Sequence, residues 1–270
     1  MKLSICPTPI GNLRDITLRV LDTLNEADVI AAEDSRHTRK LLTHYDIKTR
    51  LIRYDDHHSQ AGLETVMDLL RSGKHVALVS DAGMPVISDP GIPLIRQCLE
   101  EGIEVDVLPG ATAFVNALVL SGLAADSFTF YGFLPRKQSE LRRKLAEIKP
   151  RKEVFIIYEA PHRIVKTLTE LKALLGNRQV VLARELTKMH EEVLRMDIAS
   201  LMEELTLHPR KGEMVLLVSG APEEEISTTI EQELISLLEL GMSKNDAIKA
   251  VAQSRHVAKR EVYQVAMKLK

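Results

Sequence analysis

A dense group of ionisable side chains lies in the segment AEDSRHTR, residues 32–39. Glu33 and Asp34 are adjacent carboxylates, and Arg36 and His37 follow after a single serine. Such a group could hold a charged or hydroxyl-bearing substrate, and one of its carboxylates could act as a base. Alternatively, Asp34 or the serine only caps a helix whose first turn faces solvent. The residues alone leave both interpretations open.

A second segment suited to chemistry is VSDAGMPVISDPG, residues 79–91. It contains two prolines, two glycines and two aspartates, more than a connection from a strand to a helix needs. Asp81 could accept a hydrogen bond from a ribose hydroxyl or an amine, and Gly83 lets the backbone approach a ligand closely. We therefore predict that this loop binds an adenosine-like group.

Four further segments have a related character. In CPTPIGNLRD, residues 6–15, Gly11 permits close backbone approach, although ordinary turn chemistry explains the loop equally well. LPGATA, residues 108–113, opens a predicted helix whose free N–H groups could bind a carboxylate. YEAPHR at 158–163 and ARELTK at 183–188 place charged side chains at the ends of two predicted strands.

The elements that position these loops are short β-rich runs alternating with amphipathic stretches. This alternation predicts a buried, mostly parallel sheet, in which loops at the carboxyl ends of the strands hold the ligand. The pattern restarts near residue 125, so we predict two α/β domains, 1–124 and 125–222, with a site in the cleft between them. The predicted strands are 3–7, 29–34, 51–54, 75–81, 104–109, 128–133, 153–159, 179–185 and 213–219. The predicted helices of the first half are 18–27, 36–45, 63–71, 92–101 and 112–121.

The net charge of −2 averages over unlike pieces. Residues 223–240 contain six glutamates and no lysine or arginine, whereas residues 241–270 carry a net +5. Helical spacing there, with Ser243 as a predicted N-cap, indicates a helical, helix-turn-helix-like extension over residues 223–270. The stretch 134–152 holds eight lysines or arginines against two glutamates, which is typical of either a solvated helix face or a contact with RNA phosphates.

The composition bounds the protein further. Hydrophobic residues at 45% and charged residues at 27% exclude wholesale disorder and a fibrous repeat. The two cysteines, Cys6 and Cys98, lie in no CxxC or histidine-flanked setting, so we predict buried thiols and no metal. No apolar run is long enough for a signal peptide or a membrane span, and we expect a cytoplasmic protein.

Seven motifs occur in register with a known family: PTPIGNLRDIT, AAEDSRHTRKLL, SDAGMPVISDPG, LPGATA, GFLPRK, YEAPHR and ARELTKMHEE. Over roughly residues 3–220 the chain resembles the rRNA-modifying branch of the tetrapyrrole methylase superfamily. The resemblance implies two α/β domains with S-adenosylmethionine in the cleft between them, and a homodimer. It also implies methylation of the ribose 2′-oxygen of a cytidine in the decoding region of 16S rRNA, in free RNA or in the small ribosomal subunit. The first loop lacks the GxGPGD-like form usual among enzymes that act on tetrapyrroles, which argues against corrin or sirohaem substrates.

The predicted site residues fall into three groups. Cofactor contacts implied by the resemblance, together with Gly11 and Asp81 from the loop chemistry, are Pro9, Gly11, Asp81, Gly83, Pro85, Ile87, Asp89, Thr112, Ala113, Tyr158, Leu186, Gly212, Glu213 and Met214. For the methyl transfer we expect Glu33 or Asp34 as the base, with Arg36, His37 or Lys188 organising phosphate and oxyanion. RNA contacts are expected at Arg136, Lys137, Arg142, Arg143 and in the tail after Gly241. The alternatives are a methyltransferase that acts on a small macrocycle and an RNA-binding protein without catalytic activity.

Overall fold

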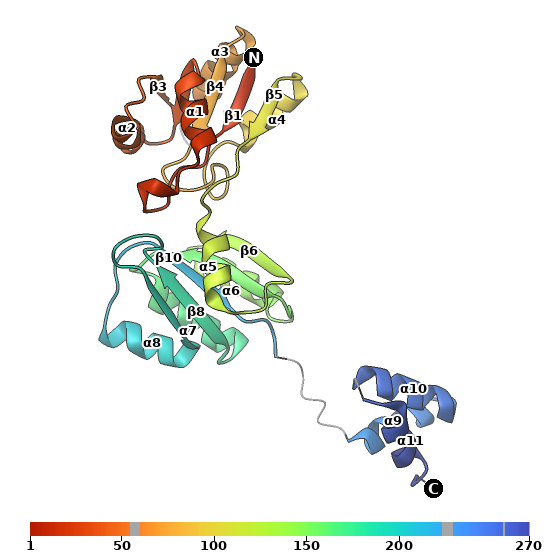
Figure 1. Cartoon of the computed structure of the whole chain (residues 1–270). Helices are drawn as coiled ribbons and strands as arrows, with labels where there is room; N and C mark the ends of the chain where they lie inside the picture. The colour runs from red at the N-terminus through yellow and green to blue at the C-terminus, as the bar shows by residue number, and fades with distance from the viewer. Residues whose placement is uncertain (55–59, 223–228, 256, 270) are drawn as a thin grey trace. The chain divides into compact units, whose positions relative to one another are not determined.

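The computed structural model describes residues 1–54, 60–222, 229–255 and 257–269 (Figure 1). By its internal contacts the chain divides into two compact units, Met1–Ala221 and Pro222–Lys270. The first contains two separate five-stranded sheets. The second is helical in its described residues.

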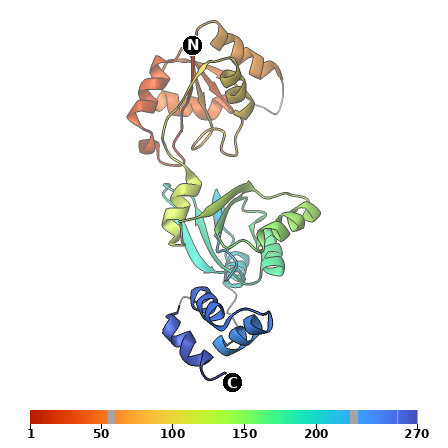
Figure 2. The same cartoon turned by 90° about the vertical axis from the view of Figure 1, so that its right-hand side faces the viewer.

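The first sheet is entirely parallel, with strand order β3-β2-β4-β1-β5. Helices α1 and α2 cover one of its faces and α3 and α4 the other, each face with its own apolar core. This arrangement confirms the parallel sheet that the alternating pattern predicts, and Figure 2 shows these helices from a second direction. The elements are β1 (Lys2–Ile5), η1 (Leu13–Asp15), α1 (Leu18–Glu26), β2 (Val29–Ala32), α2 (Ser35–His44), β3 (Arg50–Arg53), α3 (Gln60–Arg71), β4 (His75–Val79), α4 (Ile92–Glu100) and β5 (Glu104–Val107).

The second sheet is mixed, with strand order β6-β7-β10-β8-β9. Only β6 and β7 run parallel, and the other three pairings are antiparallel. Helices α6, α7 and α8 cover one face, while α5 packs on the other. The elements are α5 (Ala113–Ser121), β6 (Phe128–Phe133), α6 (Gln138–Ile148), β7 (Val154–Glu159), α7 (Ile164–Leu175), β8 (Gln179–Arg184), β9 (Glu192–Asp197), α8 (Ile198–Leu207) and β10 (Met214–Val218).

Strand β9 is absent from the sequence prediction, which places only four strands in this half. Its sequence, EVLRMD, begins and ends with acids and is exposed or half-buried at most positions. It pairs with β8 across a short connection that contains no helix, so it breaks the alternation of strands and helices on which the prediction rests. An antiparallel neighbour needs no crossover helix, and for that reason the pattern misses it.

Helix α5 joins the two sheets and packs on the second. Ala117 and Leu118 lie in one apolar cluster with residues of β7, β8 and β10. At the end of the helix, Arg195 of β9 donates from Nε to the carbonyl of Ser121 over 3.2 Å and from Nη2 to the carbonyl of Leu120. A cation there stabilises the free carbonyls at a helix C-terminus. The domain boundary near residue 124 stays a prediction. Helix α5, which lies before that boundary in the sequence, packs on the second sheet.

The C-terminal unit packs α9 (Ile230–Glu239), α10 (Lys244–Ser254) and α11 (Lys259–Ala266) around a small apolar core. The Ser243 side chain accepts a hydrogen bond from the amide of Asp246, which confirms the predicted N-cap. Three glutamates of the acidic segment, 223–225, lie outside the described residues.

Both cysteines are buried, as predicted. Cys6 lies in the core beneath α1 and α2, and burial raises the pKa of its thiol to about 12. Cys98 lies in the core beneath α3 and α4, and burial raises the pKa of its thiol to about 11. Among the described helices, none has the length and apolarity required to cross a membrane.

Candidate active site

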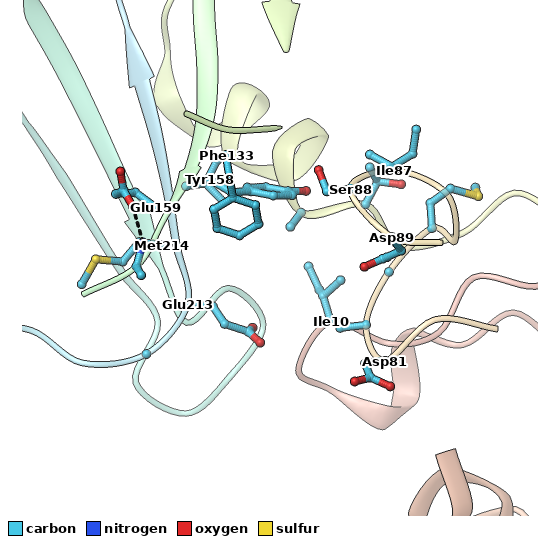
Figure 3. Close-up of a pocket in the computed structure, with 18 of the residues that line it drawn as sticks. Ile10, Asp81, Ile87, Ser88, Asp89, Phe133, Tyr158, Glu159, Glu213 and Met214 are labelled. Atoms are coloured by element: carbon cyan, nitrogen blue, oxygen red, sulfur yellow. Dashed lines mark hydrogen bonds between the residues drawn. The ribbon is translucent and has the colours of Figure 1, made fainter. Parts of the chain in front are cut away.

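A cavity of about 380 Å³ lies within the first unit, between loops that follow the first sheet and strand ends of the second (Figure 3). We name its two sides by their origin. The loop wall consists of Ile10, Asp81, Ala82, Gly83, Met84, Ile87, Ser88 and Asp89. The sheet wall consists of Phe133, Tyr158, Glu159, Ala160, Pro161, Gly212, Glu213, Met214 and Val215. Thr112 and Ala113, at the start of α5, complete the lining.

The loop wall is held in an uncommon backbone conformation. Val86 and Ser88 have φ values of 77° and 70°, in a region that side-chain-bearing residues rarely occupy. Gly83 forms a two-residue antiparallel bridge with Thr8, in which both N–H to carbonyl distances are 2.9 Å. This bridge fixes the long loop after β4 to the loop after β1. Strain of this kind persists only where surrounding contacts maintain it, and it is concentrated at functional sites.

Carboxylates give the loop wall its charge. Burial, followed by the negative charges of Glu33 and Asp81, raises the pKa of Asp89 to about 6. Asp81 accepts a hydrogen bond from the backbone amide of Asp34, with 3.2 Å between N and Oδ1. A half-buried set of carboxylates favours ligands that carry positive charge or hydroxyl donors.

The sheet wall is aromatic. Tyr158 lies with its ring centroid 5.0 Å from that of Phe130 and 5.7 Å from that of Phe133, in edge-on geometry. Phe130 stacks in turn on Phe114 of α5. Burial raises the pKa of Tyr158 to about 12, and its hydroxyl is hydrogen-bonded to the backbone of Phe114. The wall thus offers a rigid apolar surface for a ring system.

Helix α5 begins at the cavity, where Thr112 and Ala113 contribute to the lining. Its N-cap, Thr112, makes no side-chain capping hydrogen bond, so the amide that such a cap would bind is left for a ligand. The partial positive charge at the start of the helix suits a carboxylate, as the sequence predicts for this turn.

Lys188, Glu185 and Glu213 form an ion network, of which Glu213 belongs to the sheet wall. Lys188 Nζ contacts Glu185 Oε1 at 3.0 Å and Glu213 Oε2 at 2.9 Å. The same Glu185 oxygen accepts from the amide of Glu213 over 2.9 Å. Gly212 has a φ of 96°, and a Cβ placed on it would overlap the Glu185 carboxylate. A Cβ on Gly11 would lie 2.5 Å from Lys188 Cγ, so the first loop also packs directly on this network.

Most predicted cofactor residues lie around the cavity. Those in its lining are Asp81, Gly83, Ile87, Asp89, Thr112, Ala113, Tyr158, Gly212, Glu213 and Met214. Pro9, Gly11, Pro85 and Leu186 do not line it. Pro85 and Leu186 are buried, and Pro9 and Gly11 flank Ile10, which does line it. Lining residues absent from the prediction are Ile10, Ala82, Met84, Ser88, Phe133, Glu159, Ala160, Pro161 and Val215, all within or beside predicted motifs.

The predicted catalytic group on α2 is differently disposed. The Asp34 carboxylate caps α2 through the amide of Arg36 and forms an ion pair with the Arg36 guanidinium, 2.9 Å from Oδ2 to Nη2. These bonds lower the pKa of Asp34 to about 2. Its carboxylate is therefore a weak proton acceptor, better suited to holding the start of the helix than to acting as a base. Arg36 and His37 are exposed on α2 and lie outside the cavity lining, whereas Glu33 is close enough to raise the pKa of Asp89.

All four predicted RNA contacts are exposed, and two of them also form ion pairs. Arg142 forms an ion pair with the carboxylate of Glu170, 2.8 Å from Nε to Oε2, and Lys137 lies 3.5 Å from Glu140. Arg136 and Arg143 are exposed beside them. The described residues contain no group of three or more metal-ligating side chains.

Comparison with known proteins defines the class. The family described as Tetrapyrrole (Corrin/Porphyrin) Methylases matches residues 2–202. A cobalt precorrin-4 methyltransferase shares the fold with a TM-score of 0.61 at 21% identity, over 80% of this chain and 94% of the other. A diphthine synthase shares it with a TM-score of 0.62 at 16% identity, over 82% and 90%. The chain belongs to the tetrapyrrole methylase family.

Within that family, the curated relatives at higher identity carry one name. The chain is 46% identical to ribosomal RNA small subunit methyltransferase I of Halalkalibacterium halodurans, over 97% of this chain and 93% of the relative. It is 41% identical to the protein of that name in Bacillus subtilis, over 97% and 92%, and 43% identical to that in Synechocystis, over 99% and 98%. These findings confirm the resemblance drawn from the seven motifs and the predicted fold class.

Proposed function

We propose that the protein transfers a methyl group from S-adenosylmethionine to small-subunit ribosomal RNA, at the ribose 2′-oxygen of a cytidine in the decoding region of 16S rRNA. The observation that carries the proposal is the cavity, which matches in chemistry a nucleoside cofactor with an amino-acid tail. The names of the relatives at 41–46% identity support RNA as the substrate. The cytidine and its 2′-oxygen rest on the motif resemblance.

The residues of the cavity fit this cofactor. S-adenosylmethionine carries one sulfonium, one ammonium and one carboxylate, and no phosphate. Asp81 and Asp89 offer acceptors for hydroxyl or ammonium groups, the amides at the start of α5 suit the carboxylate, and Tyr158 offers a ring face. A related uroporphyrin-III C-methyltransferase from Thermus thermophilus, similar in fold with a TM-score of 0.57 at 18% identity, is described in complex with S-adenosylhomocysteine.

The chemistry divides between cofactor and protein. When bound, the cofactor supplies an activated methyl group on sulfur. The protein holds the 2′-oxygen in line with that group, and we expect most of the rate to come from this alignment. A carboxylate that accepts the hydroxyl proton lowers the barrier further.

Glu33 is our candidate base. Asp34 is engaged as a cap and its pKa is lowered to about 2, so of the predicted pair we choose Glu33, whose charge acts on Asp89 of the cavity. Asp89 is a second candidate, because a pKa of about 6 leaves it largely ionised at neutral pH and still able to accept a proton. Lys188, Arg36 and His37 are proposed to position phosphate or to stabilise the developing oxyanion.

We also propose a homodimer in the cytoplasm. Support for the dimer comes from helix α5, whose outward side chains Val115, Val119 and Leu120 are 42%, 76% and 39% exposed. Phe128 of β6 adds a further apolar side chain that is 41% exposed. Several exposed apolar side chains on neighbouring elements are typical of a contact surface. We expect Val119→Lys to shift the mass measured by light scattering toward that of a monomer.

The direct test is to map methylated nucleotides by mass spectrometry in small-subunit RNA from cells that lack the protein. Loss of one ribose methyl group, restored by the wild type but not by Glu33→Gln, supports both the substrate and the base. If Glu33→Gln and Asp89→Asn each retain full single-turnover methylation, neither is the base.

Each of the two alternative functions predicts a different experimental result. Methyl transfer from labelled cofactor to a tetrapyrrole, but not to RNA, would identify a macrocycle methyltransferase. A calorimetric titration without any binding of S-adenosylhomocysteine would favour an RNA-binding protein without catalytic activity.

A further inference from the structure

Helix α2 carries a stripe of basic side chains along its outer face. Arg36, Arg39, Lys40, Thr43 and His44 line a shallow hollow on this helix. Their spacing of three, one, three and one residues is that of a single helix face. The opposite face, formed by Thr38, Leu41 and Leu42, is buried. We call the five residues lining the hollow the α2 stripe.

The positive charge of the α2 stripe is available to a ligand. Arg39 and Lys40 have no anionic partner among the described residues, and the helix itself contains no acid. Only Arg36 is paired, with Asp34. In and beside α6, Lys137 and Arg142 form ion pairs with Glu140 and Glu170, whereas Arg136 and Arg143 are exposed and have no anionic partner among the described residues. Paired cations present less net field to an approaching polyanion than unpaired ones.

The α2 stripe begins beside the cavity. The amide of Asp34, which precedes the helix, donates to Asp81 of the loop wall. At the far end, the hydroxyl of Tyr45 donates to the carbonyl of Leu13, in the loop that also contributes Ile10 to the cavity lining. From Arg36 to His44 the helix rises about 12 Å, at 1.5 Å a residue. A nucleic-acid strand presents a phosphate about every 3.4 Å of axial rise, so a stripe of this length can contact at least two phosphates.

From these observations we infer that the α2 stripe binds the phosphates of the RNA strand that leads to the target nucleotide. The inference deepens the proposed function and rests on it. It adds α2 to the 134–152 segment as an electrostatic contact with the RNA. Arg39 and Lys40 bind phosphate oxygens of the leading strand, and Arg36, held by Asp34 at the start of the helix, lies nearest to the target nucleotide.

The test compares two double variants with the wild type. Arg39→Gln with Lys40→Gln removes the two unpaired cations of the α2 stripe. Lys166→Gln with Lys172→Gln removes the same charge from exposed positions on α7 and is the matched control. Affinities for small-subunit RNA, free and assembled, are measured at several salt concentrations, and S-adenosylhomocysteine binding is measured by calorimetry.

For the α2 variant we expect affinity for both forms of RNA to fall about tenfold at 0.1 M salt, with the slope of log affinity against log salt reduced by about 2. Cofactor affinity should not change in either variant, which also shows that both fold. An α2 variant whose RNA affinity and salt slope equal those of the control would overturn the inference. So would a loss confined to the assembled subunit, because that result indicates a ribosomal protein as the partner. Absence of methyl transfer by the wild type to either form of RNA defeats the proposed function instead.

Discussion

The two walls of the cavity are built in different ways from the same chain. The loop wall consists of irregular backbone after parallel strands and carries carboxylates, and the loop that supplies most of it holds Ser88, which lines the cavity, and Val86, which does not, at positive φ. The sheet wall consists of strand ends of a mixed sheet and presents the aromatic rings of Phe133 and Tyr158. The comparison indicates that the two walls have different roles. The strained loops supply most of the polar groups that recognise a ligand, and the sheet wall supplies the apolar surface that supports it. Substitutions on each wall can test this difference.

The largest effect is expected at Gly212, where the sheet wall becomes irregular. Gly212→Ala places a side chain at a φ of 96° and displaces the Glu185 carboxylate that binds the amide of Glu213. We expect a loss of about 3 kcal/mol in the free energy of unfolding, from the backbone penalty and the broken charge-assisted hydrogen bond. Denaturant titration measures it. Gly102→Ala, at a φ of 67° with nothing near its Cβ, is the control and should cost only about 1 kcal/mol.

The next effect is expected at the aromatic surface. Tyr158→Ala removes the ring that lies between Phe130 and Phe133, and we expect affinity for S-adenosylhomocysteine to fall roughly 30-fold, or about 2 kcal/mol. Calorimetry measures the loss. Tyr158→Phe keeps the ring and should retain most of the affinity. Equal losses in both variants would show that the hydroxyl matters more than the apolar surface.

Asp89 allows a test of the loop wall by pH. Its folded pKa of about 6 lies above the value near 3.9 of an unfolded chain, so ionisation of Asp89 disfavours the fold. Its destabilising effect is absent below about pH 4, grows between pH 4 and 6, and is complete above pH 6. Because the residue is half-buried, we expect Asp89→Asn to gain only on the order of 1 kcal/mol at pH 7 and nothing at pH 4. Identical pH profiles of unfolding for the variant and the wild type would contradict this account.

The smallest effect on stability is expected from Ser88→Gly. Glycine relieves the positive φ of 70° but adds freedom to the unfolded chain, so the two contributions nearly cancel and stability should change by less than about 0.5 kcal/mol. Cofactor affinity should fall several-fold, because the loop is less preorganised. An unchanged affinity would mean that the strained conformation of this residue contributes nothing to binding.

The sequence predicts one sheet better than the other, for a physical reason. Parallel strands need crossover helices, so the first sheet produces an alternation that can be recognised in the chain. The hairpin of β8 and β9 needs no helix, and its half-exposed second strand carries no continuous apolar run, so the prediction missed it. Helix α5 is apolar on nearly all sides, and periodicity therefore gives no indication of which sheet it packs against.

The prediction of the site from the sequence has the same limit. Loops at the carboxyl ends of the strands of a parallel sheet collect at one edge, so the cavity residues 81–89 could be predicted from their position after β4. Whether a charged side chain forms an ion pair, and how far its pKa is shifted, could not be predicted, because both depend on the folded surroundings, including partners distant in sequence. Arg142 is engaged by Glu170, 28 residues away, and the pKa of Asp89 is raised first by burial and then by the charge of Glu33.

The two buried thiols have a practical consequence. With pKa values of about 12 and about 11 and no exposure to solvent, Cys6 and Cys98 should be inert to maleimides at neutral pH. A cysteine introduced at an exposed position outside the cavity, such as Lys172 on α7, would then be the single reactive thiol, and a fluorophore attached there would leave the cavity open during turnover.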